Sequence, residues 1–358
     1  MSKTPKEGSI KKTVLSLVVE TRFVEPTVFT LTGRRIEQQP LQIQKWDCLK
    51  FTRFEGGIRL LDEILRRCQV IENQYNISCD GIALSIPGRL NGNSIVLSST
   101  RLGITQQVNV TEFFEKYKAP QCYVFHDTEC LGLGEIMSGI LTELDLAEAE
   151  KSSFAYIFVD EGVGSTLFLE GKPYIGAGSA GHLGRLVVAP LGQYNPVFLS
   201  KGSLEIFASR PWVSSHIVGQ FLTQQDKKMG TNKGSESFRK LVKSMAMDER
   251  TWNSLQYEAI AEGLEAQDPI AVSVIEEAAK YLGLAINSVI TIANPPYVII
   301  GGKMISELPS FYDKVISYAR QFSWKLAWNQ TTILQARSDR KAQGLGAVEL
   351  FRRLTEDS

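Results

Sequence analysis

An aspartate at the end of a short apolar segment is the side chain best placed to do chemistry. Asp127 follows residues 121–125, which read as a strand, and His126 precedes it directly. A carboxylate at the end of a strand can face a ligand, orient a hydroxyl group and accept its proton. The same position also suits an aspartate that caps the next helix. Asp127 is therefore a candidate general base, with helix capping as the alternative.

Two glycine segments could bind phosphate groups. Gly162-Val163-Gly164-Ser165 follows an apolar segment at 154–159, and Gly301-Gly302 follows another at 297–300. Backbone N–H groups in such segments can approach phosphate oxygens closely, because glycine has no side chain. Glycines also occur wherever a hairpin or a strand-to-helix turn is tight. Both interpretations remain open for each segment.

Strands and helices alternate along the chain and must position these residues. The hydrophobic patterns predict strands at 14–19, 24–31, 82–86, 121–125, 154–159, 166–169, 297–300 and 332–334, and helices at 58–68, 131–144, 308–322 and 341–354. The strands fall into two separated groups. This order favours two α/β lobes with a cleft between them over a single doubly wound domain.

Composition and charge exclude several classes of protein. Of the 358 residues, 43% are hydrophobic and 22% are charged, which is typical of a globular protein. The 39 basic residues balance the 39 acidic ones, so no general attraction to nucleic acid or to an anionic membrane is expected. The apolar segment 269–293 contains charged residues, which favours a buried helix over a membrane span. Residues 1–12 are polar, lack a signal peptide and predict a flexible tail of a cytoplasmic protein.

The cysteines give no sign of a metal site or a disulfide framework. Their number is odd and no two are spaced as zinc ligands are; they are Cys48, Cys68, Cys79, Cys122 and Cys130. We therefore expect reduced thiols and no zinc.

Several segments, taken in order, resemble the ROK (repressor, open reading frame, kinase) family. They are GIALSIPG at 81–88, IVLSSTRLG at 95–103, VFHDTECLGLGE at 124–135, VDEGVGSTLFLEGKPYIGAGSAGHLGR at 159–185, GSLEIFAS at 202–209, NPPYVIIGG at 294–302 and GLGA at 344–347. Their order and spacing carry the resemblance, which extends from about residue 14 to the end of the chain.

The resemblance implies the two-lobed, actin-like sugar-kinase fold, which is related to ribonuclease H, with a central cleft. It divides the chain into a tail at 1–12, an N-terminal α/β lobe at 13–126 plus 338–358, and a C-terminal α/β lobe at 127–337. It also implies a homodimer and a sugar or sugar derivative as the small-molecule ligand.

The resemblance assigns roles to individual residues. Asp127 stands at the family's catalytic aspartate. Gly162, Gly164 and Ser165 stand at its second phosphate loop, and Gly301 and Gly302 near the nucleotide. The positions expected to contact sugar are His126, Asp127, His182, Arg185, Glu205 and Arg101.

Several of these positions depart from the family pattern. His126 replaces an asparagine, and Arg101 stands where the family commonly has one. His182 replaces a glutamate, and Arg185 replaces a histidine that contacts sugar or zinc. A histidine can still bind a hydroxyl, and an arginine can bind a carboxylate or phosphate in a bidentate way. An anionic sugar derivative is therefore one expectation, and drift in a site no longer under selection is the other.

Two features of the family are absent. Residues 191–203 contain none of the zinc-binding cysteines. The first phosphate loop, Asp-x-Gly-x-Thr in the family, is replaced by Val18-Val19-Glu20-Thr21-Arg22, which has neither the aspartate for magnesium nor the glycine. This loss argues against efficient phosphoryl transfer with ATP and Mg²⁺. ROK repressors carry a helix-turn-helix domain before the first strand. Here that strand begins near Thr13, so no direct binding to nucleic acid is expected.

Three hypotheses follow, in decreasing order of support. The chain binds a sugar in the cleft with weak or no kinase activity. Alternatively, it is an active sugar kinase, a transferase of the glucokinase type, with Asp127 as base and Gly162, Gly164 and Ser165 on the phosphates. In the third hypothesis it is a non-catalytic regulatory or structural dimer subunit with a vestigial cleft.

Overall fold

A β-branched segment begins the first sheet, as the sequence predicts. In the computed structural model, which describes residues 11–52, 56–139, 152–195, 200–225, 234–337 and 340–356, this segment is β1 (Lys11–Val19). It pairs antiparallel with β2 (Phe23–Thr32) and parallel with β5 (Gly81–Ile86). The sheet order is β3-β2-β1-β5-β9, and β4 adds to β2. The other strands are β3 (Arg35–Gln38), β4 (Trp46–Asp47) and β9 (Gln121–His126).

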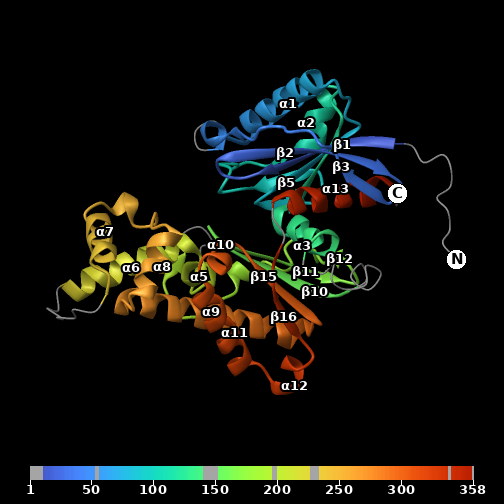
Figure 1. Ribbon diagram of the computed structural model, residues 1–358. Coiled ribbons are helices and arrows are strands. Elements are labelled where there is room, and N and C mark those ends of the chain that lie inside the picture. Colours follow the sequence, from blue (N-terminus) through green and yellow to red (C-terminus); the bar gives the residue numbers. More distant parts are fainter. Residues whose placement is uncertain are drawn as a thin grey trace. The chain divides into compact units, whose positions relative to one another are not determined.

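Helices cover both faces of this sheet. Figure 1 shows α1 (Gly56–Tyr75) and α2 (Val110–Lys116) on one face and α13 (Arg340–Glu356) on the other. A small sheet of β6 (Arg89–Asn91), β7 (Ile95–Ser98) and β8 (Val108–Asn109) adjoins them. The core between the sheet and α1 is mostly aliphatic, and it contains four of the five cysteines. All five cysteines are buried and free, in agreement with the prediction of reduced thiols.

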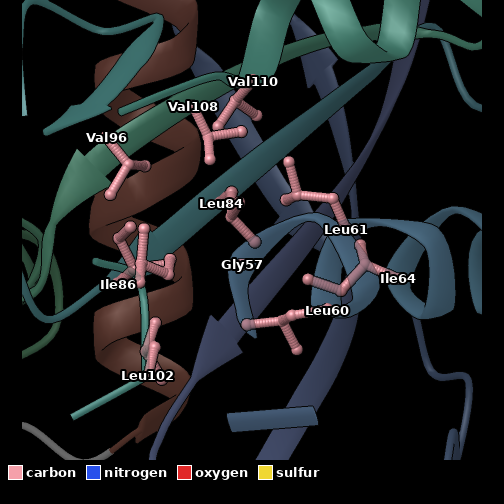
Figure 2. Close-up of a pocket in the computed structure, with 11 residues that line it drawn as sticks. Gly57, Leu60, Leu61, Ile64, Leu84, Ile86, Val96, Leu102, Val108 and Val110 are labelled. Atoms are coloured by element: carbon pink, nitrogen blue, oxygen red, sulfur yellow. The ribbon is translucent and has the colours of Figure 1, made fainter. Parts of the chain in front are cut away.

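One cavity lies inside this core, and it is too small to hold a ligand. It has a volume of about 10 Å³ and is lined by α1 residues such as Leu60 and Ile64, by Leu84 of β5 and by Val96 of β7 (Figure 2). A water molecule needs about 10–15 Å³ and several polar partners. Because all the lining side chains are apolar, this space is a packing defect of the core.

The second sheet has the order β12-β11-β10-β15-β16. At its centre, β10 (Phe154–Val159) runs antiparallel to β11 (Val163–Leu169) and parallel to β15 (Tyr297–Gly301). The edge strands are β12 (Lys172–Pro173) and β16 (Thr332–Gln335), and a separate ribbon joins β13 (Tyr194–Asn195) to β14 (Ser200–Lys201).

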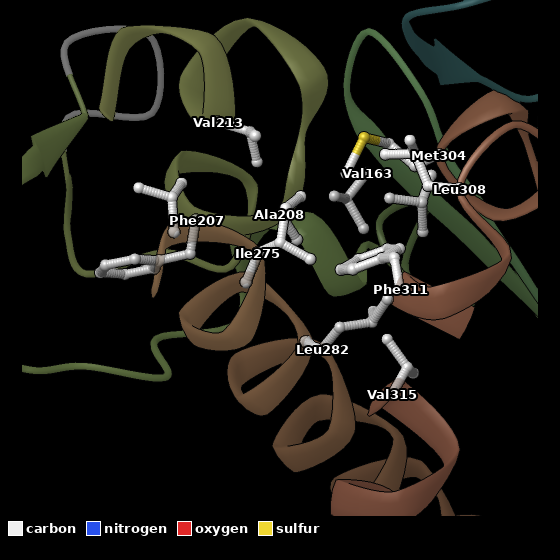
Figure 3. Packing of buried hydrophobic residues seen from close by; sticks show 14 of the residues in the cluster. Val163, Phe207, Ala208, Val213, Ile275, Leu282, Met304, Leu308, Phe311 and Val315 are labelled. Atoms are coloured by element: carbon white, nitrogen blue, oxygen red, sulfur yellow. The ribbon is translucent and has the colours of Figure 1, made fainter. Parts of the chain in front are cut away.

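A helical core packs on one face of this sheet. Alternate residues of β10 and β15, including Ile157 and Ile300, join the cluster that Figure 3 shows around α9 and α11. The helices are α5 (Glu205–Ala208), α6 (Arg210–Gln225), α7 (Glu236–Ala246), α8 (Tyr257–Glu265), α9 (Pro269–Ala293), α10 (Lys303–Ser306), α11 (Pro309–Phe322) and α12 (Lys325–Trp328). The apolar segment 269–293 is thus α9, packed against α11. No helix among the described residues is long and apolar enough to span a membrane.

The chain divides into two compact units. The first unit comprises residues 1–150, 175–179 and 337–358, and the second comprises residues 151–174 and 180–336. Our sequence-based division placed residue 127 onward in the second lobe. In the structure α3 (Asp127–Met137) groups with the first unit because it packs directly on α13. The predicted tail, 1–12, lies almost wholly outside the described residues, and residues 140–144 of the predicted helix 131–144 lie outside them as well.

Close contact between α3 and α13 depends on glycine. A methyl group added at Gly346 of α13 would lie 2.0 Å from the carbonyl oxygen of Cys130, and one added at Gly134 of α3 would lie 2.6 Å from that of Ala342. Contacts this short are repulsive, so both helices need glycine where they meet. Since α3 begins at Asp127, this contact also fixes the position of the candidate base.

We predict that Gly346→Ala lowers the free energy of unfolding by roughly 1–3 kcal/mol, because the extra methyl group overpacks this helix pair. Gly219→Ala in α6 is the control. No atom lies within 4 Å of a methyl group there, and alanine should stabilise the helix by up to about 1 kcal/mol. Thermal unfolding followed by circular dichroism would measure both effects. Equal transition temperatures for the two variants would contradict the packing argument.

Candidate functional site

The predicted site residues are distributed over both units. Arg101, His126 and Asp127 belong to the first unit. The second unit contains the two glycine segments and the predicted sugar contacts His182, Arg185 and Glu205.

Asp127 is the first residue of α3 and follows β9 directly. Its Oδ1 atom accepts the backbone N–H of Thr128 at 2.8 Å and lies 3.1 Å from Nδ1 of His126. The same histidine nitrogen lies 2.8 Å from the Thr128 hydroxyl. The start of a helix favours a negative charge, and the Asp127 side chain is 17% exposed. Capping and reactivity are thus compatible here: Oδ1 serves the helix, whereas no hydrogen bond or ion pair of Oδ2 occurs among the described residues.

A neighbouring carboxyl group, Glu129, was not singled out in the sequence. It accepts the backbone N–H of His126, and burial raises its pKa, with a further increase from the charge of Asp127. A glutamate three residues after a helix N-cap is a known spacing for this backbone contact, so the pattern His126-x-x-Glu129 could have revealed it. Glu129 is therefore a second carboxyl group close to Asp127, and its pKa is raised by burial.

Arg101 lies in the turn that links Ser99 to Ile104 and is half-buried. The turn needs Gly103, which has a φ of +64° and approaches the Thr52 carbonyl so closely that a methyl group would lie 2.1 Å from its oxygen.

The turn after β1 lacks every feature of a phosphate loop. Glu20 donates its backbone N–H to the Phe23 carbonyl at 2.8 Å, which closes a tight hairpin between β1 and β2. The hydroxyl of Thr52 donates to the Thr21 carbonyl at 2.6 Å. Arg22 forms an ion pair with Asp47 at 3.0 Å. The turn is thus fastened to its own chain, and the backbone N–H of Glu20 is already used within it.

The second glycine segment also differs from a free loop. Val159 and Val163 are a strand pair, so the connection is only Asp160, Glu161 and Gly162, closed by the Asp160 N–H on the Gly162 carbonyl at 3.0 Å. Gly164 and Ser165 lie within β11. The sequence placed these two residues in a loop before the strand, because the small side chains masked where the strand begins.

Intramolecular contacts already occupy this segment. The Val163 N–H donates to Oε2 of Glu205 at 3.2 Å. The Ser165 hydroxyl donates to the Gly181 carbonyl and accepts the Leu183 N–H at 2.9 Å. Glu205 and Ser165, both expected to meet ligands, therefore also fasten the start of β11 to α5 and to the segment 181–183.

An acidic pair with a buried arginine lies beside this segment and was missed in the sequence. Arg210 is 9% exposed and donates through Nε to Glu161 at 2.7 Å and through Nη1 to the Leu255 carbonyl at 2.8 Å. The Tyr257 hydroxyl donates to Asp160, and burial together with the Asp160 charge raises the pKa of Tyr257. Because Arg210 follows Glu161 by 49 residues, no local pattern could have paired them.

The segment with His182 and Arg185 forms a short 3-10 turn, Leu183–Arg185, against β11. Gly184 is buried, and a methyl group there would lie 2.2 Å from the Val163 carbonyl oxygen. His182 is half-buried and Arg185 is exposed. Both have contacts within the chain, so neither side chain is a free binding group.

The glycines at the end of β15, Gly301 and Gly302, serve packing. Gly302 has a φ of +98°, and a methyl group there would lie 2.3 Å from the Val159 carbonyl oxygen. One at Gly301 would lie 2.7 Å from the Tyr156 hydroxyl. Their proximity to a nucleotide remains a prediction, as does the absence of zinc. Among the described residues, no three His, Cys, Asp or Glu side chains gather as metal ligands.

We predict that Glu129→Gln makes stability less sensitive to pH. A buried carboxyl whose pKa lies above the ordinary value of about 4.3 binds more protons in the native state, so wild-type stability falls as the pH rises above that value. Glutamine can still accept the His126 N–H but does not titrate. Between pH 4 and 8, the free energy of unfolding of the variant should therefore increase relative to that of the wild type as the pH rises. Glu115→Gln, at an exposed position, is the control; a parallel pH dependence of Glu129→Gln and the wild type would refute the expectation.

We also predict that Arg210→Met lowers the free energy of unfolding by about 2–3 kcal/mol, because it leaves the Leu255 carbonyl and Glu161 without their donor. Arg250→Met is the matched control. Arg250 is 89% exposed in its ion pair with Asp248, so its loss should leave the free energy of unfolding almost unchanged. Urea denaturation measures both, and similar losses would show that burial of Arg210 is unimportant.

Comparisons with known proteins agree on the family and on the fold. A model of the ROK family matches residues 60–354. Among solved structures, a ROK hexokinase from Thermus thermophilus is 19% identical with a TM-score of 0.70, covering 97% of this chain and all of the other. A ROK family transcriptional regulator, a homologue of the E. coli MLC protein, is 22% identical with a TM-score of 0.70 over 95% and 78% of the two chains.

A ROK family glucokinase from Streptomyces griseus, in complex with glucose and AMPPNP, is 17% identical with a TM-score of 0.67, covering 94% of this chain and 98% of that one. These similarities confirm the predicted fold class, that of the ROK sugar kinases. With the family model matching most of its length, the chain belongs to the ROK family.

Proposed function

We propose that this chain binds a sugar or sugar derivative and has weak or no ATP-dependent kinase activity. The fold is shared by a hexokinase and by a transcriptional regulator, so the activity must be inferred from the residues. The observation that carries the proposal is the hydrogen bond from the Val163 N–H to the Glu205 carboxylate. An internal anion occupies the backbone donor that a phosphate oxygen would need.

Local charge supports the same conclusion. Asp160 and Glu161 form the connection between β10 and β11, and the buried cation beside them, Arg210, is already bound to Glu161. Two unit charges 4 Å apart repel by about 4 kcal/mol at the effective dielectric constant of a protein surface. A nucleotide phosphate at this connection would approach like charges.

Sugar binding requires different groups, and Asp127 can supply one of them. Carboxylates accept hydrogen bonds from sugar hydroxyls, and Oδ2 of Asp127 has no hydrogen-bond or ion-pair partner in the described part of the chain. The glucose complex of the similar glucokinase supports a sugar as the ligand. Arg185 is exposed and, beside its contacts within the chain, its guanidinium group can add recognition of a carboxylate or phosphate on the sugar. An acidic sugar such as a uronic acid fits this group.

The remaining expectations are part of the same proposal. We infer a cytoplasmic homodimer that does not itself bind nucleic acid. The neutral overall charge supports the last point, because it supplies no general attraction to a polyanion.

A thermal-shift screen tests the proposal. Neutral sugars, amino sugars, uronic acids and sugar phosphates are each added with and without Mg-ATP. A ligand at a hundred times its dissociation constant stabilises the native state by about 2.7 kcal/mol. We predict a shift with one class of sugar and none with Mg-ATP. The shift should disappear in Asp127→Asn and persist in Asp62→Asn, a control on the exposed face of α1.

The other outcomes select the rival functions. A Mg-ATP shift that grows with the sugar, together with product formation lost in Asp127→Asn, would establish a kinase. A chain that responds to neither ligand would be a regulatory or structural subunit. An equal loss of neutral and acidic sugar binding in Arg185→Ala would exclude recognition of an anionic sugar by Arg185.

A further inference from the structure

A broad groove in the second unit is lined by none of the residues that we discussed as sugar or nucleotide contacts. Its volume is about 1320 Å³, and it is bordered by the loop 189–193 and by α5, α6 and α9. Pockets for small ligands usually have volumes of roughly 300–1000 Å³ and mostly apolar walls with a few polar groups. This groove is therefore large enough for a small organic molecule.

Aromatic rings form a continuous wall of the groove. The ring of Phe207 lies 4.2 Å from that of Tyr281 and 6.1 Å from that of His216, measured between centroids. His216 in turn lies 6.5 Å from the ring of Trp212. Trp252 lines the groove as well. Figure 3 shows Phe207 beside α9 at the core cluster, so the hydrophobic core holds this part of the wall in place.

Among the described residues that line the groove, the one charged side chain is negative. It is Glu277, one helical turn before Tyr281, and none of these described lining residues is a lysine or an arginine. Within the described part of the chain, the Glu277 carboxylate has no hydrogen-bond or ion-pair partner. The preceding residue, Glu276, faces elsewhere and is bound by Lys314 and by the Tyr318 hydroxyl. In the described part of the groove, a negative charge without a compensating cation thus lies beside a row of aromatic rings.

The histidine on this wall does not supply the missing positive charge. Burial lowers the pKa of His216, which favours the neutral ring at neutral pH. Its Nε2 atom lies 3.1 Å from Oε1 of Gln193, the arrangement expected when Nε2 carries the proton and donates it. Burial and the charge of Glu277 raise the pKa of Tyr281, so its hydroxyl stays neutral.

We propose that this groove binds a small organic ammonium ion, held by the aromatic wall of Phe207, Trp212 and Tyr281 and by the charge of Glu277. Aromatic faces attract cations through their quadrupole, and the attraction is strongest where water is excluded. A carboxylate without a partner adds a Coulomb term of the same sign. The ligand class follows from charge complementarity. A neutral molecule of equal shape would leave Glu277 without an ionic partner, and an anionic molecule would be repelled by it.

Choline and its uncharged isostere 3,3-dimethylbutan-1-ol give the sharpest test. The two molecules have the same shape and differ only in the charge of the quaternary centre. Isothermal titration of the full chain should give choline at least about tenfold higher affinity than the isostere, in line with the usual strength of cation–π contacts joined to a carboxylate. Equal affinities, or no binding of either molecule, would overturn the proposal.

Matched variants locate the binding. Glu277→Gln should weaken choline about fivefold or more and leave the isostere unchanged. Glu276→Gln, on the same helix but facing Lys314, should leave both unchanged. Trp212→Leu should weaken choline as well, and circular dichroism would confirm that each variant is folded. Choline binding that survives both Glu277→Gln and Trp212→Leu would place the cation elsewhere and refute the assignment. The proposed sugar site shares none of these residues, so each proposal can fail alone.

Discussion

The hydrogen bond between the Val163 amide and the Glu205 carboxylate is the constraint on which the second unit's candidate site depends. A glycine segment binds phosphate because its amides lack internal partners and its surroundings are not negative. Here the amide has a partner that is itself an anion, and Asp160 and Glu161 lie beside it. Glu205 begins α5, so the contact also ties the connection between β10 and β11 to the helical core. Binding of a phosphate to the Val163 amide would have to break this contact.

The glycines of this unit fit the same picture. Gly184 and Gly302 each allow a backbone carbonyl of the β10–β11 hairpin to approach within a distance that no side chain would permit. Their need for glycine is explained by packing alone. A glycine pattern inherited with the fold can therefore persist for its packing while the chemistry associated with it is lost. Asp127 is different, because the helix that it begins uses only one of its two carboxylate oxygens.

The sequence predicted the framework well because the framework depends on local patterns. The β-branched segments became β1, β5 and β10, and the mixed apolar and charged segment 269–293 became α9. The limits of β11 were harder, because Gly164 and Ser165 have no strand preference of their own and are held in the strand by pairing with β10. Contacts between distant residues, such as Arg210 with Glu161 and Glu205 with Val163, carry no local signal. The groove beside α9 could not be predicted from the sequence for the same reason, because its aromatic wall is formed by residues of α5, α6 and α9.

Equilibrium dialysis of Mg-ATP against the wild-type chain, at saturating concentration of whichever sugar stabilises it, tests the central claim most directly. The account predicts no saturable nucleotide binding up to about 1 mM, the upper end of typical enzyme affinities for substrate. Saturable binding in the micromolar range would contradict it, because the Val163 amide would then have to exchange Glu205 for a phosphate at little cost.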